Sequence, residues 1–368
     1  MPAGQSEKQP FSGSFGIRRM RKLAPAGEGA RRARFTPKPH RDSDRSEFAI
    51  GSYVSFRGAI CGSGGPSRDL VAMRSIANGW DLAAMRRRTF RVVIAVPLAL
   101  IVIGAGAAFS WPAVRHVISG LWNIPDRLPA LSPGSQVHYQ PGAEDYARDV
   151  AALLPDAIAQ IEVLHGRRFA HPVTVGVYAT PEAFAAANGL GSAAPVGVTF
   201  LGRVNLSPKL FWSQHERLPA ILTHELSHAH IEAWIGLNGY IRLPNWFKEG
   251  LAVMVSKGGG AELVSDEEAR AAIQRGEQIA IYDAGSLHNM AVIRFERAPA
   301  KTASWYPVVL AYRQAGMFVN YLRELDGPAF DRMMNAALDG RPFAEAVTVG
   351  YHDDLRSLWQ KFIKSRSP

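Results

Sequence analysis

Two histidines and a glutamate in the segment HELSH, residues 224–228, form the most chemically informative pattern in this chain. An α-helix turns once in about 3.6 residues, so His224 and His228 lie about one turn apart on one helix face. Their imidazoles can therefore bind one metal ion, and Glu225 can reach a water on that ion. Glu249 follows 21 residues after His228. Metal-assisted hydrolysis of a peptide bond needs this set of residues.

The ligand set predicts a catalytic zinc site, because such a site takes three protein ligands and keeps one position for water. His224, His228 and Glu249 supply three ligands. Glu225 would accept a proton from the attacking water and later pass it to the leaving amine. Small residues follow Glu249, and they let its helix approach a neighbour closely: Gly250 and Ala252.

Two other residues bear on the ligand set. His230 lies two residues beyond His228, so it points to a different helix face and is not expected to bind the metal. The single cysteine, Cys61, excludes an intrachain disulfide and a cysteine-based zinc site.

The net charge of +10 is unevenly distributed along the chain. Residues 1–91 contain 18 Lys and Arg against 7 Asp and Glu, whereas the remainder contains 24 against 25. The basic character therefore belongs to the N-terminal part. The rest is close to neutral, and we expect no nucleic-acid partner.

Residues 92–114 form an uncharged run of 23 residues, enough to span a bilayer as a helix. Basic residues precede it: Arg86, Arg87, Arg88 and Arg91. By the positive-inside rule, residues 85–115 are a single-pass signal-anchor in the cell inner membrane, with the C-terminal part outside the cytoplasm. Alternatively, Met85 starts a signal peptide that is cleaved near residues 105–107, and the product is secreted or periplasmic.

Four segments follow from composition and periodicity. Residues 1–84 are predicted to be a disordered basic tail, which could also lie upstream of the true start. Residues 85–115 are the membrane segment or signal, residues 116–141 a proline-rich linker, and residues 142–364 the folded domain.

The folded domain is predicted to be α+β, with a few strands first and a mostly helical part after them. Strands are expected over 173–178, 196–201 and 203–206. Helices are expected over 143–165, 181–188, about 217–235, 246–256, 262–275, 306–325, 331–338 and 353–363. Gly236 should end the metal-binding helix. Its start is open between a capping box at Ser213 and a start near Leu218, which places Pro219 in the first turn.

Three stretches together resemble a known family: ILTHELSH (221–228), LPNWFKEGLA (243–252), and YRQA (312–315) followed by FVNYL (318–322). The chain resembles the gluzincin metallopeptidases, and more narrowly the bacterial peptidase MA-like domains. This resemblance implies a thermolysin-like zincin fold, zinc on His224, His228 and Glu249, and Glu225 as the base. It also implies Tyr312 as the donor to the oxyanion; Tyr306 and His288 are further candidates.

The resulting hypothesis is an exported, membrane-anchored zinc peptidase that acts on a peptide or protein substrate. One alternative is a non-catalytic envelope module that keeps the zincin fold to bind or scaffold. Another is a cell-wall amide hydrolase, because the same zinc chemistry would cleave a peptidoglycan cross-link.

Overall fold

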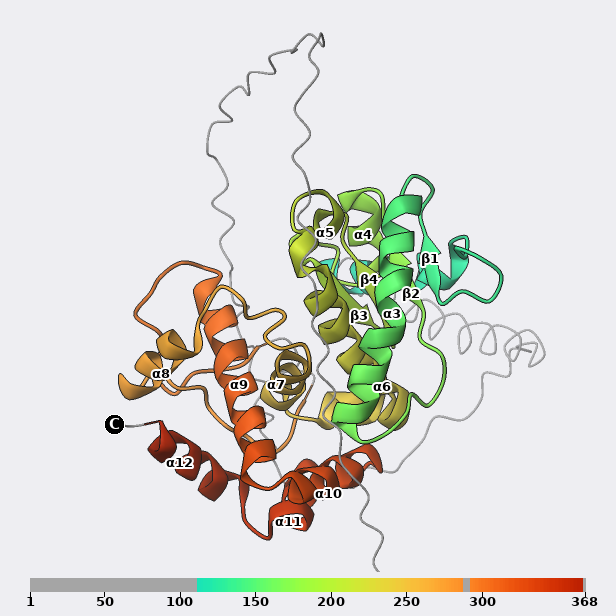
Figure 1. The fold of residues 1–368 in the computed structure, drawn as a ribbon. Helices are drawn as coiled ribbons and strands as arrows, with labels where there is room; N and C mark the ends of the chain where they lie inside the picture. The colour runs from blue at the N-terminus through green and yellow to red at the C-terminus, as the bar shows by residue number, and fades with distance from the viewer. Residues whose placement is uncertain (1–110, 287–291, 367–368) are drawn as a thin grey trace, which may run out of the picture. The chain divides into compact units, whose positions relative to one another are not determined.

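The computed structural model describes residues 111–286 and 292–366. This part of the chain is α+β: one four-stranded sheet accompanies a larger number of helices (Figure 1). The expected tail, residues 1–84, and most of the expected membrane segment lie outside the described residues. Among the described residues, no helix combines the length and apolar character that crossing a bilayer requires.

The sheet consists of β1 (Val137–Tyr139), β2 (Val175–Val177), β3 (Gly197–Phe200) and β4 (Arg203–Leu206), in the order β1-β2-β4-β3. β1 and β4 both run parallel to β2. β3 and β4, both expected as strands, form an antiparallel hairpin with Gly202 at a φ of 72° in its turn. β3 is therefore an edge strand.

The segment expected as a linker, residues 116–141, contains regular structure. β1 pairs with β2, and α2 (Pro112–Trp122) and the 3-10 turn η1 (Pro125–Arg127) precede it. The Ser119 hydroxyl donates a 2.9 Å hydrogen bond to the carbonyl of Ala186, and this bond links α2 to the segment that follows β2. A three-residue strand is too short to show a period in the sequence, which is why the prolines dominated the prediction.

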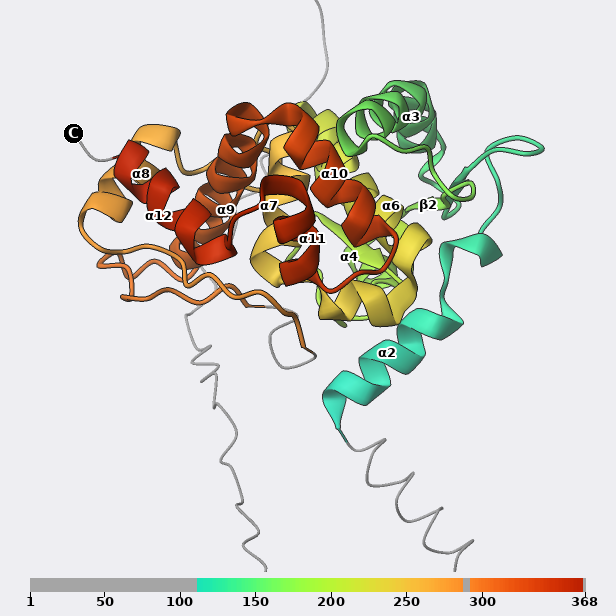
Figure 2. The same cartoon turned by 90° about the horizontal axis from the view of Figure 1, so that it is seen from below.

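The helices account for most of the fold. In the sheet-bearing part they are α3 (Glu144–His165), α4 (Pro181–Ala187), α5 (Lys209–Trp212) and α6 (Leu218–Arg242), with the 3-10 turn η2 (His215–Arg217) before α6. The others are α7 (Asn245–Val255), α8 (Asp266–Gln274), α9 (Tyr306–Leu325), α10 (Gly327–Leu338), α11 (Phe343–Tyr351) and α12 (Leu355–Ser365). Figures 1 and 2 show α6 and α7 between the sheet with α3 on one side and α8 to α12 on the other.

The helix that carries His224 and His228, α6, begins at Leu218 with Pro219 in its first turn, so the second of the two expected starts is the observed one. Gly236 does not end the helix as predicted. It takes φ 65° and ψ 173°, values that favour glycine, and the chain kinks there and continues as helix to Arg242. Between the kink and the start, residues 221–231 are all buried. A helix that is covered on all sides belongs to the core, and this one packs against the sheet, α3 and α7.

α7 and α9 approach each other at glycines. A Cβ added at Gly250 would lie 2.6 Å from the carbonyl oxygen of Ala315, and one at Gly316 would lie 2.5 Å from a methyl carbon of Val253. The predicted close approach beside Glu249 is thus confirmed at Gly250. Its consequence is that α9 carries Tyr312 to the same region as the histidines of α6.

Candidate metal centre

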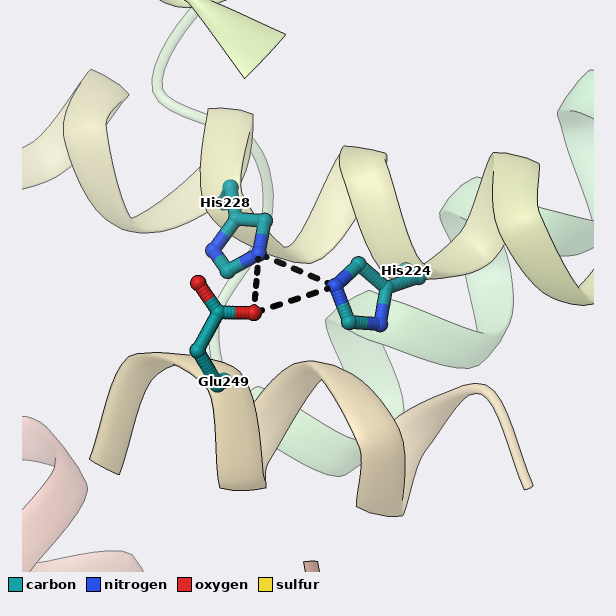
Figure 3. A group of neighbouring side chains, drawn as sticks. All are labelled: His224, His228 and Glu249. Atoms are coloured by element: carbon teal, nitrogen blue, oxygen red, sulfur yellow. Dashed lines mark hydrogen bonds and ion pairs between the residues drawn. The ribbon is translucent and has the colours of Figure 1, made fainter. Parts of the chain in front are cut away.

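Three side chains from two helices converge on one point. His224 and His228 project from α6, and Glu249 projects from α7 (Figure 3). The two Nε2 atoms lie 3.2 Å apart. Oε2 of Glu249 lies 3.4 Å from Nε2 of His224 and 3.5 Å from Nε2 of His228. Both histidines are buried, at 4% and 5% exposure.

These separations match a shared cation. Ligand atoms about 2.0–2.1 Å from the centre of a tetrahedron are about 3.3–3.4 Å from one another. The observed distances of 3.2, 3.4 and 3.5 Å bracket that value. His224, His228 and Glu249, predicted as ligands from sequence, therefore form a group that could hold a metal ion.

Hydrogen bonds at the far side of each imidazole orient the two ligands. Nδ1 of His224 lies 2.9 Å from the carbonyl oxygen of Gly259, which can only accept, so Nδ1 carries a proton and Nε2 is the nitrogen that can bind a cation. Nδ1 of His228 lies 3.0 Å from the hydroxyl of Tyr240. The Gly259 carbonyl thus selects the tautomer of His224, whereas the Tyr240 hydroxyl, which can donate or accept, fixes the orientation of the His228 ring.

The electrostatics of the cluster favour positive charge between the three side chains. Burial acts against ionisation of Glu249, but the neighbouring imidazoles of His228 and His224 outweigh it and hold the pKa of this carboxyl well below its usual value. Burial also acts against the charged form of His224, but Glu249 and Glu225 outweigh it and raise the pKa of this imidazole. An anionic oxygen thus faces two buried imidazole nitrogens.

Glu225, predicted as the base, lies between α6 and the edge strand β3. The Thr199 hydroxyl lies 2.9 Å from Oε2 of Glu225 and 2.8 Å from its backbone oxygen. A Cβ added at Gly197 would meet Glu225 at 2.8 Å from Cγ and 2.9 Å from Oε1. Glycine at position 197 therefore gives this carboxylate its room against the strand.

Tyr312 lies beside the cluster, stacked on His224 with ring centroids 6.2 Å apart and an interplanar angle of 16°. Burial and the nearby carboxylates of Glu249 and Glu225 raise its pKa well above 10, so the phenol is neutral. The other candidates are not in this group: Tyr306 contacts Lys301 through a cation–π interaction, and His288 lies outside the described residues.

The Gly258-Gly259-Gly260 segment was not recognised from sequence as part of the site. A Cβ at Gly259 would lie 2.6 Å from the carbonyl oxygen of Ala220 on α6. This close approach lets the Gly259 carbonyl reach His224. The side chain of Arg313 donates to the carbonyls of Val264 and Ala261, each at 2.8 Å, and holds the segment in place. A run of three glycines after a helix was the available signal.

Tyr240 and Lys248 were also missed. Tyr240 follows the kink at Gly236, so helical spacing counted from His228 does not reveal its contact. Lys248 precedes Glu249 and is only 1% exposed, and burial lowers its pKa to about 8. No sequence pattern distinguishes it from the exposed lysines of other helices.

His230 faces away from the cluster, as predicted. Its Nδ1 lies 2.9 Å from Nδ1 of His165, and its Nε2 lies 2.9 Å from the carbonyl oxygen of Arg167. Ser227 reaches the other nitrogen of His165 at 3.2 Å. These polar atoms are paired with one another behind α6.

Comparisons with protein-family models, with curated proteins and with solved structures found no match for this chain. The residues themselves therefore carry the interpretation of the site. They form a cluster of two histidines and one glutamate, with a further glutamate and a tyrosine beside it.

Proposed function

We propose that this chain is a zinc-dependent peptidase of the gluzincin type, with a thermolysin-like catalytic domain. The observation that carries the proposal is the convergence of His224, His228 and Glu249 at tetrahedral spacing, with Glu225 adjacent in the helix. Two imidazole nitrogens and one carboxylate oxygen are a donor set that zinc uses in catalytic sites. The same chemistry underlies the resemblance to the peptidase MA-like domains.

A bound zinc ion would polarise a substrate carbonyl and make a coordinated water acidic at neutral pH. Glu225 would take the proton of the attacking water and return it to the leaving amine. Thr199, at 2.9 Å from Oε2, would hold this carboxylate in position between these transfers. Tyr312 would donate a hydrogen bond to the developing oxyanion, because its raised pKa keeps the phenol protonated.

The edge strand β3 supports an extended peptide as the substrate. Ser207 N donates to Val196 O, which makes that pair hydrogen-bonded in the ladder with β4. By the alternation of an antiparallel ladder, the backbone groups of Gly197 and Thr199 point away from β4. β3 is partly exposed along its length, and a substrate backbone that pairs with it would pass beside Glu225.

The location of the enzyme is a separate part of the proposal. The uncharged run over residues 92–114 and the arginines before it support an inner-membrane protein with the catalytic domain outside the cytoplasm, or a secreted or periplasmic product after cleavage.

The deciding experiment compares the full-length wild-type chain with Glu225→Gln and His228→Ala, after zinc loading and removal of free metal. We expect one zinc per chain and cleavage of an unfolded protein substrate by the wild type. Glu225→Gln should keep the zinc and lose at least ~1,000-fold in kcat, because a base and a proton donor are lost while the ligands remain. His228→Ala should lose both.

Three outcomes would count against the proposal in different ways. A wild-type chain that takes up no zinc would contradict the metal site. A chain that holds zinc but cleaves neither unfolded proteins nor peptidoglycan fragments would instead favour the envelope-binding module. Cleavage of peptidoglycan fragments alone would identify the amide hydrolase.

A further inference from the structure

The hydroxyl of Tyr240 is the side-chain partner of a candidate metal ligand. It lies 3.0 Å from Nδ1 of His228, and the two rings meet edge to face, with centroids 6.2 Å apart and an interplanar angle of 89°. Tyr240 reaches this position because the kink at Gly236 redirects the second part of α6. The contact thus joins two halves of one helix across a break.

Lys248 is attached to Tyr240 in two ways. Its Nζ lies 4.2 Å from the centroid of the Tyr240 ring and donates a 3.2 Å hydrogen bond to the backbone oxygen of Tyr240. The side chain is almost completely buried. Burying an ammonium group costs free energy unless specific partners compensate, so a lysine placed here is held by these contacts.

Together the contacts connect both helices that carry the ligands. Lys248 immediately precedes Glu249 on α7, and Tyr240 contacts His228 on α6. A displacement of α6 or α7 would therefore disturb the contact between Lys248 and Tyr240, and with it the contact between Tyr240 and His228. Nδ1 of His224 is paired with the backbone carbonyl of Gly259 instead.

We propose that Tyr240 is a positioning residue for His228 and that Lys248 holds Tyr240 in place. This inference rests on the metal site proposed above. For Nε2 of His228 to offer a lone pair to a cation, its proton must sit on Nδ1. With a cation on Nε2, the phenol oxygen of Tyr240 would accept that proton in a hydrogen bond, which holds the plane of the His228 ring.

The test measures zinc affinity of the full-length chain by competition with a chromophoric chelator. Tyr240→Phe removes only the hydroxyl and should weaken zinc binding by ~10–100-fold, the usual effect of losing an outer partner. Tyr351→Phe is the matched control, since it removes a hydroxyl that donates to the carbonyl of Leu322 away from the site. It should leave the zinc affinity unchanged.

A second measurement separates positioning from general destabilisation. In the zinc-loaded chain labelled with ¹⁵N-histidine, the Nδ1 proton of His228 should be visible and protected from exchange with water. Tyr240→Phe should abolish that protection while the signal of His224 persists. Lys248→Met should weaken zinc binding less than Tyr240→Phe, and the two effects should be non-additive in the double variant.

The outcomes distinguish this inference from the proposed function. If the wild type binds no zinc, the metal site itself fails. If the wild type binds one zinc and Tyr240→Phe binds it equally tightly, with the His228 proton still protected, the role of Tyr240 is overturned and the metal site stands. Additive effects of the two substitutions would overturn the role of Lys248.

Discussion

Two histidine clusters lie on opposite faces of α6, and they differ in how their polar atoms are paired. The front cluster contains His224, His228 and Glu249. Its inner atoms, two imidazole nitrogens and a carboxylate oxygen, face one another (Figure 3). The rear cluster contains His230 and His165, whose nitrogens alternate as donors and acceptors along one chain of hydrogen bonds.

The rear chain can be followed atom by atom. The Arg167 carbonyl can only accept, so Nε2 of His230 carries a proton and Nδ1 accepts from Nδ1 of His165. Nε2 of His165 then accepts from Ser227. Every ring nitrogen has a partner, and both imidazoles are neutral. The neutral, paired imidazoles of the rear cluster need no cation. In the front cluster, by contrast, the two Nε2 atoms and the Glu249 oxygen would share a partner if a cation were bound between them.

The pKa directions follow this difference. Burial lowers the pKa of His165 well below 6.5, and the neighbouring His230 and His228 lower it further. Burial also lowers the pKa of His230. On the front face the carboxylates reverse the effect of burial, and the pKa of His224 is raised. The lesson is that burial alone does not decide the charge of a histidine, because its nearest partners do.

The most direct test of the difference between the two clusters is to remove one histidine from each face of α6. His228→Ala should lower zinc affinity by at least ~1,000-fold, more than the ~10–100-fold typical of an outer partner. His230→Ala should leave zinc affinity within about threefold, but lower the free energy of unfolding in EDTA by ~2–4 kcal/mol, through unpaired polar groups and a cavity. Chelator competition and urea denaturation measure the two quantities.

Each variant is the control for the other. The loss of unfolding free energy in EDTA should be smaller for His228→Ala than for His230→Ala. If His230→Ala lost zinc as completely as His228→Ala, the two faces would not be independent, and the assignment of ligands to the front face alone would be wrong.

A pH series in EDTA tests the opposite pKa directions. The folded pKa of His165 lies below the unfolded value of about 6.5, so below pH 6.5 the unfolded chain binds a proton that the folded chain does not. Stability from this residue is therefore complete above pH 6.5 and lost as the pH falls, by ~1.4 kcal/mol per pH unit. His224, with a raised pKa, contributes in the opposite sense, with stability lost as the pH rises through its folded value.

His165→Gln isolates the rear contribution because glutamine does not titrate. Its free energy of unfolding, measured by urea denaturation between pH 7 and pH 5, should fall with decreasing pH less steeply than that of the wild type. Equal slopes in the two proteins would show that folding does not lower the pKa of His165.

The sequence predicted most elements because their signals are local. The run over residues 306–325 appears as α9, and Thr180 caps α4 with its hydroxyl 3.2 Å from Ala183 N, as the Thr-Pro pair predicts. β1 was missed since three residues show no period, and α11 was not expected. The helix expected over 246–256 begins one residue earlier, at Asn245, directly after Pro244.

The candidate metal ligands were predictable because two of them share one helix face. Their outer partners were not, because each is brought to the site by a change of chain direction. Tyr240 follows the kink at Gly236, and Gly259 follows the end of α7. Every residue has a backbone carbonyl, so the sequence does not show that the carbonyl of Gly259 acts as a hydrogen-bond acceptor. The only signal at this position is the small residue that the close approach requires.

Glycines beside each cluster allow the finest test of the comparison. A Cβ in Gly259→Ala would lie 2.6 Å from the Ala220 carbonyl oxygen, which must move the Gly259 carbonyl away from His224. We expect zinc affinity to fall about tenfold. Gly166 takes a φ of 69° beside the rear cluster and has no atom within 4 Å of its Cβ direction. Gly166→Ala should lower the free energy of unfolding by about 1 kcal/mol through strain at positive φ.

The matched pair is informative because both changes add one methyl group. Zinc affinity in Gly166→Ala should equal that of the wild type, since Gly166 adjoins the Arg167 carbonyl of the rear chain and no front ligand. Equal zinc affinity in Gly259→Ala and the wild type would mean that the Gly259 carbonyl does not set the orientation of His224. Tyr240 would then be the outer partner that matters for the front cluster. The loss of zinc affinity in Tyr240→Phe should in that case lie near the upper end of ~10–100-fold.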